Sequence, residues 1–402
     1  MIAETIFFVY NLNMIVLSIE TSCDDTGISI IKKASNKKKK GIDFNDFEIL
    51  AESVSSQASL HSPYGGVFPS LAKREHQKNL VPLLVLCLKK SKLLKPNKKG
   101  FDIKKILKVK KLLEKNPELF ESIKIVFEKY ARPDINKIAV TTGPGLEPCL
   151  WTGINLGRSL SMYWDIPLVS INHLEGHILS SWLTPIEKVE FPAVALVVSG
   201  GNTQLIQMQE IGKYKLIGET KDDAAGECFD KTARILGLGY PGGPSIRKKA
   251  SKYKNEKFNI SLPRPMIHEK NFDFSFSGLK TAVLYDFKKR TKKEQTSKEY
   301  IEEMCFKIEK AIIEVLIHKT IKAALSTKTK SIILGGGVSA NKELIKELKK
   351  QCKINKIDFI YPHTKFTGDN ASMIALASLF SPNAKNITWQ KIKANSNYKI
   401  NG

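Results

Sequence analysis

Two histidines stand four residues apart in the segment Ile171–Trp182, which reads INHLEGHILSSW. Residues four apart share one face of a helix, so the imidazoles of His173 and His177 can hold one divalent ion. The spacing is not that of HExxH proteases, because Glu175 stands in the wrong place to be their general base. The pair equally fits an ordinary helix start, with Asn172 as N-cap and Glu175 completing a capping box. A metal site needs a third ligand from elsewhere.

Asp369 offers that third ligand, in the segment FTGDNASMIALASL. A carboxylate there could complete a set of two histidines and one aspartate, with open positions for a substrate. Asp369 also stands at the start of an apolar helix that we expect over 370–380, and capping a helix is a common role for aspartate. Spacing alone favours the cap over the ligand.

Two glycine-rich loops could bind a ligand through bare backbone N–H groups. VVSGGNTQ (Val197–Gln204) has two glycines at the tip of a predicted hairpin, where a plain tight turn is the simpler interpretation. GGGVSAN (Gly335–Asn341) lies between a predicted strand and a helix, a position that suits phosphate or nucleotide binding. The second loop matches neither GxGxxG nor the Walker pattern, so neither class of nucleotide site is indicated.

Asp230 precedes Arg234 by four residues in a helix that we expect over 224–236. The simple interpretation is a surface ion pair worth a few tenths of a kcal/mol. The functional interpretation is a carboxylate that accepts hydrogen bonds from a ligand. The following YPGGP (Tyr240–Pro244) is a loop, or a glycine gap beside a flat ligand.

The elements that must position these residues follow a repeated design. IVLSIETSCDDTGISII (Ile15–Ile31) and AVALVVSGGNTQLIQM (Ala193–Met208) both read as β-hairpins with polar or glycine-rich tips. The third such strand, in Ser331–Leu348, leads through the GGG loop into a helix. Similar openings about one domain apart indicate an internally duplicated α/β protein. A long amphipathic helix is expected over 297–326.

Composition is that of a globular chain of 402 residues, 42% hydrophobic and 26% charged. No apolar run is long enough for a membrane span. Six cysteines without a CxxC pair indicate a reducing cytosol. The formal charge of +24 suits either lysine-rich surface loops or a nucleic-acid backbone as partner. Basic surface insertions are expected at Lys32–Asp46 and Ser91–Arg132, the second of them helical.

Taken together, nine segments closely resemble, in wording and order, the tRNA N6-adenosine threonylcarbamoyltransferase family, called TsaD in bacteria. The resemblance runs from about Met14 to Phe380 and skips the two basic insertions. The segments are IETSCDDTG, YGGVFPSLAKREH, GPGLEPCLWTGINLGRSL, NHLEGH, VSGGNTQL, DDAAGECFDKTARILGLGYPGGP, FSFSGLKTA, GGGVSAN and TGDNASM.

The resemblance implies the α/β fold of actin, Hsp70 and the sugar kinases, with two RNase H-like lobes around a central cleft. We expect an N-terminal tail and two lobes, with a C-terminal helix that returns to the first lobe. The second lobe is expected to carry the metal and donor site. The expected divisions are 1–13 for the tail, 14–168 for the first lobe with its insertions, 169–368 for the second, and 369–402 for the C-terminal part.

The family transfers a threonylcarbamoyl group from threonylcarbamoyl-AMP to the N6 amine of adenosine 37, in tRNAs that read codons beginning with A. The resemblance implies a divalent metal, iron(II) or else zinc(II), held by His173, His177 and Asp369. It assigns no catalytic base, and Asp24 and Glu20 of the first motif receive no role. The donor is expected on Val197, Val198, Ser199, Gly200, Gly201, Asp230, Gly243 and Asn341.

The motif wording is closer to a divergent bacterial member than to an archaeal one. A bacterial member implies a cytoplasmic enzyme with a smaller paralogous subunit (TsaB-like) and an ATPase subunit (TsaE-like). Three other functions fit parts of the sequence. The histidine pair suggests a metallopeptidase, the hairpins and glycine loops suggest a sugar kinase or ATPase, and the charge suggests a non-catalytic RNA-binding scaffold.

Overall fold

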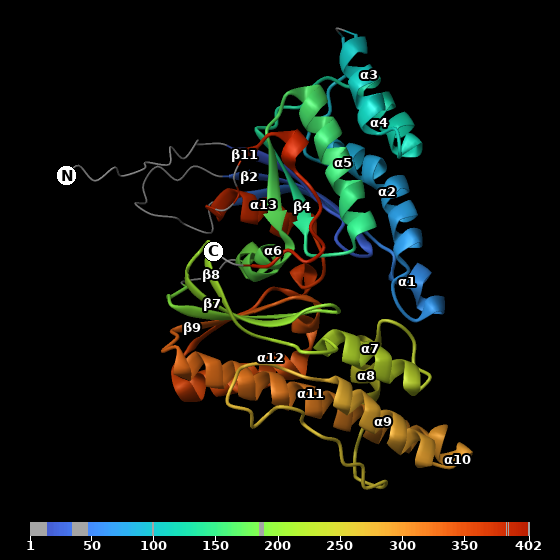
Figure 1. Cartoon of the computed structure of the whole chain (residues 1–402), viewed down its shortest axis with the longest axis vertical. Helices are drawn as coiled ribbons and strands as arrows, with labels where there is room; N and C mark the ends of the chain where they lie inside the picture. The colour runs from blue at the N-terminus through green and yellow to red at the C-terminus, as the bar shows by residue number, and fades with distance from the viewer. Residues whose placement is uncertain are drawn as a thin grey trace, which may run out of the picture.

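The computed structural model describes residues 14–33, 47–98, 100–184, 189–382, 384 and 386–400. The expected N-terminal tail lies outside the described residues, as does the first basic insertion from residue 34 to residue 46. Figure 1 shows two lobes, each built on one sheet and covered by helices on its outer side. None of the described helices combines the length and apolar character needed to cross a membrane.

The sheet of the first lobe has six strands in the order β11-β5-β4-β1-β2-β3. Strands β1, β2 and β3 are antiparallel neighbours, so the first hairpin forms as predicted. Strands β1, β4 and β5 are parallel, and β11 adds to β5 antiparallel. Strand β5 runs past the boundary expected after residue 168 and pairs within this sheet. The strands are β1 (Ile15–Glu20), β2 (Asp25–Lys33), β3 (Phe47–Ser56), β4 (Lys137–Gly143), β5 (Leu168–Asn172) and β11 (Asn386–Ile387).

The sheet of the second lobe repeats this arrangement with five strands in the order β10-β9-β6-β7-β8. Strands β6, β7 and β8 are antiparallel neighbours, and β6, β9 and β10 are parallel. Each of the two sheets thus has a three-stranded meander followed by two parallel strands, which is the RNase H-like order. The repetition confirms the duplicated fold of the actin, Hsp70 and sugar-kinase type. The strands are β6 (Ala193–Val198), β7 (Thr203–Glu210), β8 (Lys213–Glu219), β9 (Ser331–Gly335) and β10 (Asp358–Ile360).

Helices of the first lobe pack on one face of its sheet. The second basic insertion is helical as predicted, but it is not only a surface feature. Leu119, Ile123 and Phe127 of α4 are fully buried in the same apolar core as α2 and α5. Burying such side chains removes apolar area from water, so α4 stabilises this lobe. The helices are α1 (Ala58–His61), η1 (Ser62–Tyr64), α2 (Pro69–Lys90), α3 (Ile103–Leu112), α4 (Pro117–Lys129) and α5 (Glu147–Trp164).

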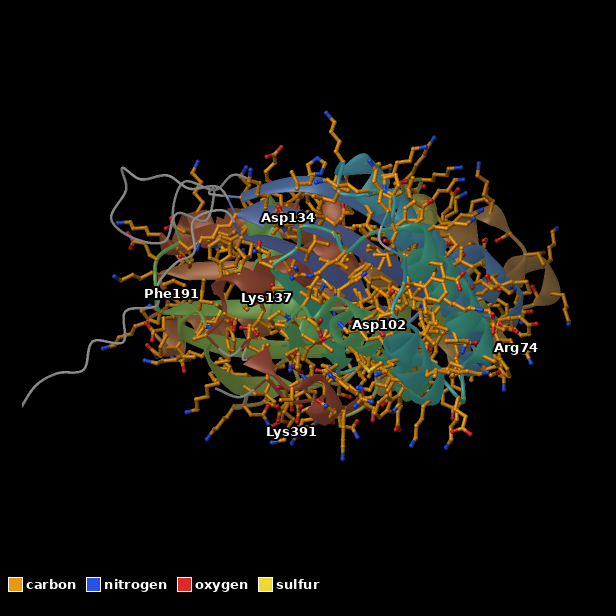
Figure 2. All side chains as sticks on the ribbon, turned by 90° about the horizontal axis from the view of Figure 1, so that it is seen from above. Arg74, Asp102, Asp134, Lys137, Phe191 and Lys391 are labelled. Carbon is orange, nitrogen blue, oxygen red and sulfur yellow. The ribbon has the colours of Figure 1, made fainter. Side chains whose placement is uncertain are left out.

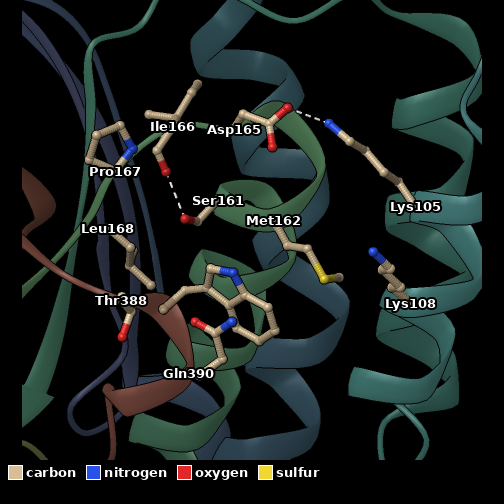
Figure 3. A pocket seen from close by; sticks show the side chains of 11 residues that line it. Lys105, Lys108, Ser161, Met162, Asp165, Ile166, Pro167, Leu168, Thr388 and Gln390 are labelled. Atoms are coloured by element: carbon tan, nitrogen blue, oxygen red, sulfur yellow. Dashed lines mark hydrogen bonds and ion pairs between the residues drawn. The ribbon is translucent and has the colours of Figure 1, made fainter.

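Helix α3 is tied to the C-terminal end of α5 by polar contacts. Lys105 Nζ contacts the Asp165 carboxylate and donates to the Tyr163 carbonyl at 3.1 Å. A cavity of about 490 Å³ lies between these helices and η5 (Trp389–Lys391), with Lys108 on one wall (Figure 3). In the view of Figure 2, nitrogen-tipped side chains project around the whole outline without gathering in one patch.

The second lobe carries the long helix that the sequence predicts, α11, whose N-cap Ser297 accepts from the Tyr300 N–H. Packing of α11 against α7, α8, α9 and α12 forms the largest apolar core. The predicted helix over 224–236 is α7. The helices are α7 (Ala225–Ile235), α8 (Gly242–Ala250), α9 (Ser277–Lys289), α10 (Lys292–Gln295), α11 (Lys298–Ser326), η3 (Gly337–Ala340), α12 (Lys342–Asn355) and η4 (Thr364–Phe366).

Two helices from distant parts of the chain meet between the lobes. Helix α6 (His173–Leu179), continued by η2 (Ser180–Leu183), follows β5, and α13 (Ala371–Phe380) comes back to pack on β1 and β2. One apolar cluster joins Val16 of the first sheet, Ile374 of α13 and Ile333 of the second sheet. A Cβ atom on Gly176 would lie 2.9 Å from the Ile374 side chain, so glycine lets α6 and α13 approach this closely.

Candidate active site

The two histidines and the distant carboxylate come together where α6 meets the loop before α13. Asp369 Oδ1 lies 3.1 Å from His177 Nε2 and 3.5 Å from His173 Nε2. The two imidazole rings have centroids 4.5 Å apart, and both side chains are buried. One ligand atom from each of the three residues falls within 4.8 Å of the others. Asp369 is almost two hundred residues away from the two histidines in the sequence, and the fold brings all three side chains together.

The N-terminal caps of α6 and α13 agree with the sequence interpretation only in part. Asn172 caps α6 as predicted, since its Oδ1 accepts from the Leu174 N–H at 2.9 Å. The capping box is wrong, because Glu175 is buried and accepts from the Tyr214 hydroxyl at 2.8 Å instead. The cap of α13 is Asn370, whose Oδ1 accepts from the Met373 N–H at 2.9 Å. The interpretation of Asp369 as the cap is therefore wrong, and its carboxylate is free to face the histidines.

Glu20, which the sequence analysis named without a role, is a candidate positioning residue of the site. Its carboxylate is fully buried, and Oε2 lies 3.1 Å from His173 Nδ1. Thr141 Oγ1 donates to the same oxygen at 2.6 Å, and the Ser22 N–H donates to Oε1 at 2.6 Å. A carboxylate on one ring nitrogen fixes the tautomer and turns the other nitrogen toward a ligand. The signal in the sequence was a glutamate that ends an otherwise apolar strand.

Opposite charges in this cluster shift the pKa values of its side chains. Burial lowers the pKa of His173, but the Glu20 and Asp369 carboxylates outweigh burial and raise that pKa to about 9. Burial acts to raise the pKa of Asp369, yet the His173 and His177 imidazoles hold it below its ordinary value. Burial, and then the Asp369 carboxylate, raise the pKa of Asp25 to about 7. The site therefore favours positive charge close to Asp369.

The donor atoms of this cluster fit a divalent ion. Two imidazole nitrogens and one carboxylate oxygen make a borderline ligand set that suits iron(II) or zinc(II) and leaves positions open for a substrate. Among the described residues, neither ring nitrogen of buried His177 has an aligned hydrogen bond, although Asp369 is close. A buried nitrogen without a partner is costly unless something binds it, and an ion here would do so.

Two glycines of the GGG loop serve packing rather than ligand binding. A Cβ atom on Gly335 would lie 2.5 Å from the His177 carbonyl oxygen, so the end of β9 presses on the backbone of α6. Gly336 has a φ of +88° and lies against the Val198 carbonyl. Only Gly337 has open space around its α-carbon. Gly335 and Gly336 therefore let the loop pack closely against the backbone of α6 and of β6.

The loop after β6 is open where a ligand could approach. Val197 and Val198 are fully buried at the end of β6, and the Ser199 N–H donates to the Asn202 carbonyl at 2.8 Å. A Cβ atom on Gly200 or Gly201 would meet nothing within 4 Å. Packing does not require glycine at these two positions, whereas close approach of a ligand to the backbone does.

The other three expected donor residues line the second lobe. Asp230 Oδ1 accepts from the Gly242 N–H at 2.7 Å, and burial raises the pKa of Asp230 to about 6. Within the described residues Asp230 makes no ion pair with Arg234, so the surface-pair interpretation is wrong. Gly243 lies in the first turn of α8 with open space around it. Asn341 caps α12 through Oδ1 and donates through Nδ2 to Glu309 at 2.8 Å, so its side chain has a structural role.

The fold and the cluster define a two-lobed α/β protein with a candidate metal-dependent transfer site between its sheets. The family model described as tRNA N6-adenosine threonylcarbamoyltransferase (TsaD) matches residues 48–99 and 117–376. The chain belongs to this family of transferases. The unmatched residues 100–116 contain α3.

Curated relatives agree with this assignment. A tRNA N6-adenosine threonylcarbamoyltransferase of Francisella tularensis subsp. holarctica is 39% identical over 370 residues, which cover 91% of this chain and 94% of the relative. The protein of the same name from Ralstonia pickettii is 39% identical over 365 residues, 90% of each chain. Among solved structures, HypF in a phosphate- and nucleotide-bound form gives a TM-score of 0.47 at 11% identity, over 92% of this chain and 56% of that chain. That structural likeness is too weak to add to the assignment.

Replacing Glu20 with glutamine is expected to weaken divalent-ion binding about 10- to 100-fold, the usual effect of losing an outer carboxylate partner. Glutamine keeps the shape of Glu20 but removes the charge beside His173 and leaves one acceptor oxygen where the carboxylate uses two, one toward His173 and Thr141 and one toward the Ser22 N–H. Competition between the protein and a chromophoric chelator for Zn²⁺ or Co²⁺ measures the change. The matched control is Glu75→Gln, because Glu75 pairs only with Lys78 at 2.7 Å on the surface of α2. Equal affinity of Glu20→Gln and wild type, with unchanged thermal unfolding, would show that Glu20 does not orient a ligand.

Proposed function

We propose that the chain transfers the threonylcarbamoyl group from threonylcarbamoyl-AMP to the N6 amine of adenosine 37, in tRNAs that read codons beginning with A, and releases AMP. Membership of the family supports this activity. The observation that carries it is local: the His177 backbone and the Val198 backbone are pressed against two adjacent glycines, Gly335 and Gly336. The residues proposed to hold a metal and the loop proposed to hold the donor therefore adjoin.

His173, His177 and Asp369 are proposed to hold one divalent ion, iron(II) as the first candidate and zinc(II) as the second. Such an ion supplies a Lewis acid and a template for a donor carbonyl. The chain fixes the ligand set itself, since Glu20 orients His173 and Asn370 leaves Asp369 free.

The loop of residues 197–201 and the first turn of α8 are proposed to hold the donor. Backbone N–H groups at Gly200 and Gly201 can donate to its carbonyl or carboxylate oxygens, because no side chain shields them. The N-terminus of α8 favours a phosphate. Asp230 keeps Oδ2 for a hydroxyl or amino group of the adenosine, while its Oδ1 holds the Gly242 N–H.

Transfer then requires that the tRNA amine reach the carbamoyl carbon. The amine nitrogen forms the new bond to carbon, the bond from that carbon to the AMP oxygen breaks, and the amine loses one proton. Holding both reactants in one orientation turns an encounter in solution into a reaction within one complex. The donor held on the second lobe then faces the crevice between the lobes. An RNA base that enters this crevice beside the first lobe meets the donor there.

The proposed partners are tRNA, threonylcarbamoyl-AMP, a smaller TsaB-like paralogous subunit and a TsaE-like ATPase subunit. The proposed location is the cytoplasm. Six free cysteines support a reducing compartment, because five of them are buried as thiols and none forms a disulfide within the described residues.

Two other enzyme classes are not favoured. A metallopeptidase needs a carboxylate to activate a metal-bound water, and the one glutamate of α6, Glu175, is engaged by Tyr214 away from the histidine face. A sugar kinase would use the GGG loop to bind phosphate, but backbone atoms of His177 and Val198 occupy the space beside two of its glycines. A scaffold without catalysis would not need the buried ligand set.

The test is a reconstituted assay with unmodified tRNA, threonine, bicarbonate, ATP and a donor-making enzyme, with and without candidate partner subunits. Mass spectrometry of the digested tRNA should show threonylcarbamoyladenosine at position 37. A chelator added to the assay should prevent its formation. Peptide cleavage sensitive to the same chelator, without modified nucleoside, would overturn the proposal. Robust ATP turnover by the chain alone, again without modified nucleoside, would favour the kinase class.

A further inference from the structure

Two aromatic side chains are stacked and exposed at the edge of the crevice between the lobes. Tyr64 of η1 is 61% exposed, and Phe68, the N-cap of α2, is 52% exposed. Their ring centroids lie 5.8 Å apart with an angle of 24° between the rings. Neither ring joins the apolar core of the first lobe. Two large rings held side by side in water present a ready surface for another flat group.

An arginine from the other lobe lies beside this aromatic pair. The Arg234 Nε atom would be 2.7 Å from a Cβ atom on Gly65, so the side chain of α7 reaches across to the first lobe. Gly65 has a φ of +64°, which also favours glycine. Within the described residues Arg234 makes no ion pair, and its side chain lines a cavity together with Asp230. The Arg234 residue is exposed to solvent.

A cavity of about 330 Å³ lies between Tyr64 of this pair and Asp230, one of the residues proposed to hold the donor. Its walls are Ser62–Gly65 from the first lobe and Asp230, Arg234 and Gly237–Tyr240 from the second. Burial, and then the Asp24 and Asp230 carboxylates, raise the pKa of Tyr240. Tyr240, in the wall of the cavity, is thus influenced by the charge of Asp24 from the first lobe and of Asp230 from the second.

The charges near the pair suit an anionic partner. Arg74, labelled at the rim in Figure 2, and Lys73 follow Phe68 on α2, and neither forms an ion pair within the described part of the chain. Glu75 pairs with Lys78 at 2.7 Å and Glu227 with Lys231 at 2.9 Å, whereas the Asp230 carboxylate in the cavity wall has no ion pair within the described residues. Aromatic faces, a free guanidinium and unpaired cations together are the features that bind single-stranded nucleic acid.

We propose that Tyr64, Phe68 and Arg234 form a platform on which an unpaired base next to the modified adenosine stacks, so that the adenosine itself can enter the cavity. The inference rests on the proposed function and names positioning residues for its RNA substrate. A base in a loop can be splayed out and stacked on an aromatic ring or a guanidinium plane, whereas a base in a duplex cannot. The platform thus selects a single-stranded loop rather than a stem.

The test uses the full chain, with the same partner subunits throughout, and two anticodon stem–loop RNAs that carry 2-aminopurine on either side of the target adenosine. Wild type should quench the 2-aminopurine in at least one RNA, because stacking quenches its fluorescence. The double variant Tyr64→Ala/Phe68→Ala should lose that quenching and bind the RNA about tenfold more weakly or worse. The salt dependence of binding should keep its slope, because neither residue carries charge.

Two further variants make the outcome specific. Tyr285→Ala removes a ring that is 60% exposed on α9, away from the crevice, and should bind RNA like wild type. The conservative pair Tyr64→Phe/Phe68→Tyr should restore quenching and affinity. Unchanged quenching and affinity in the double alanine variant would overturn the platform, even if tRNA modification proceeds normally. Loss of a partner subunit from the double variant, with RNA affinity intact, would overturn it in favour of a protein interface.

Failure of the proposed function looks different from failure of the platform. If wild type with its partners modifies no tRNA, the activity is wrong, and quenching by wild type still reports whether the rings bind RNA. If wild type is active and the double variant is equally active at limiting RNA, the platform is wrong and the activity stands. In the supporting case the double variant raises the KM for tRNA and leaves the KM for the donor unchanged.

Discussion

Replacing Asp369 with alanine is expected to remove the proposed ion and reduce tRNA modification more than 100-fold. Loss of an outer-shell partner already weakens metal binding by about 10- to 100-fold, and Asp369 is placed as a direct ligand. Its Oδ1 atom is within 3.5 Å of both histidine Nε2 atoms, and among the described residues no other carboxylate joins the two histidines in a ligand set. Metal content by mass spectrometry and the reconstituted modification assay measure the two effects.

The control variants separate a lost ligand from a damaged fold. Asp369→Asn keeps the size of the side chain and one acceptor oxygen, so it should unfold at the wild-type temperature while still losing most of the metal. Asp358→Ala removes an exposed aspartate from β10 in the same part of the sequence and should change neither metal content nor activity. If Asp369→Ala retained a full complement of metal and wild-type turnover, the proposed ligand set would be wrong.

Sequence periodicity predicted most of the elements that carry the site. The two hairpins, the long helix α11 and the helices α7 and α13 all lie where the pattern of apolar residues and caps placed them. These predictions succeed because each depends on local spacing: alternation for strands, and every third or fourth residue for helices. The same local rules suggested that α4 was a surface insertion. Its burial depends on contacts with α2 and α5 that lie far away in the chain.

The site itself was only partly visible to local reasoning. Asn172 was predicted correctly as a cap, but Glu175 and Asp369 were both interpreted as capping residues. In the structure Tyr214 engages Glu175, and Asn370 replaces Asp369 as the cap. Each correction involves a partner or competitor that spacing cannot weigh. Before the fold was known, only the resemblance to a family favoured Asp369 as a ligand beside the histidines over Asp369 as a cap.

Glu20 shows a different limit of sequence reasoning. A buried glutamate looks unfavourable until its partners are known, because a buried carboxylate is costly unless it is paired and hydrogen-bonded. Its partners are His173, the Thr141 hydroxyl and the Ser22 N–H, from three separate segments. Side chains that orient other side chains leave no spacing pattern, so such positioning residues are found only from the folded chain.

Gly335→Ala is expected to lower the free energy of unfolding by about 3 kcal/mol, the upper part of the range for inserting one carbon into a closely packed interior. The new Cβ atom would lie 2.5 Å from the His177 carbonyl oxygen, and 3.0 Å from its carbonyl carbon. Both neighbours are backbone atoms, so α6 must shift as a whole. Because α6 carries both histidines, metal affinity should fall together with stability, which denaturant unfolding and chelator competition measure separately.

Gly337→Ala is the matched control in the same loop. A Cβ atom there would meet nothing within 4 Å, and alanine also restricts the unfolded chain, so stability should change by less than about 1 kcal/mol. Metal affinity should stay at the wild-type value. If Gly335→Ala proved as stable and as tightly metal-bound as Gly337→Ala, then β9 would not press on α6 as the contact requires. The glycine at position 335 would then need an explanation other than close packing against α6.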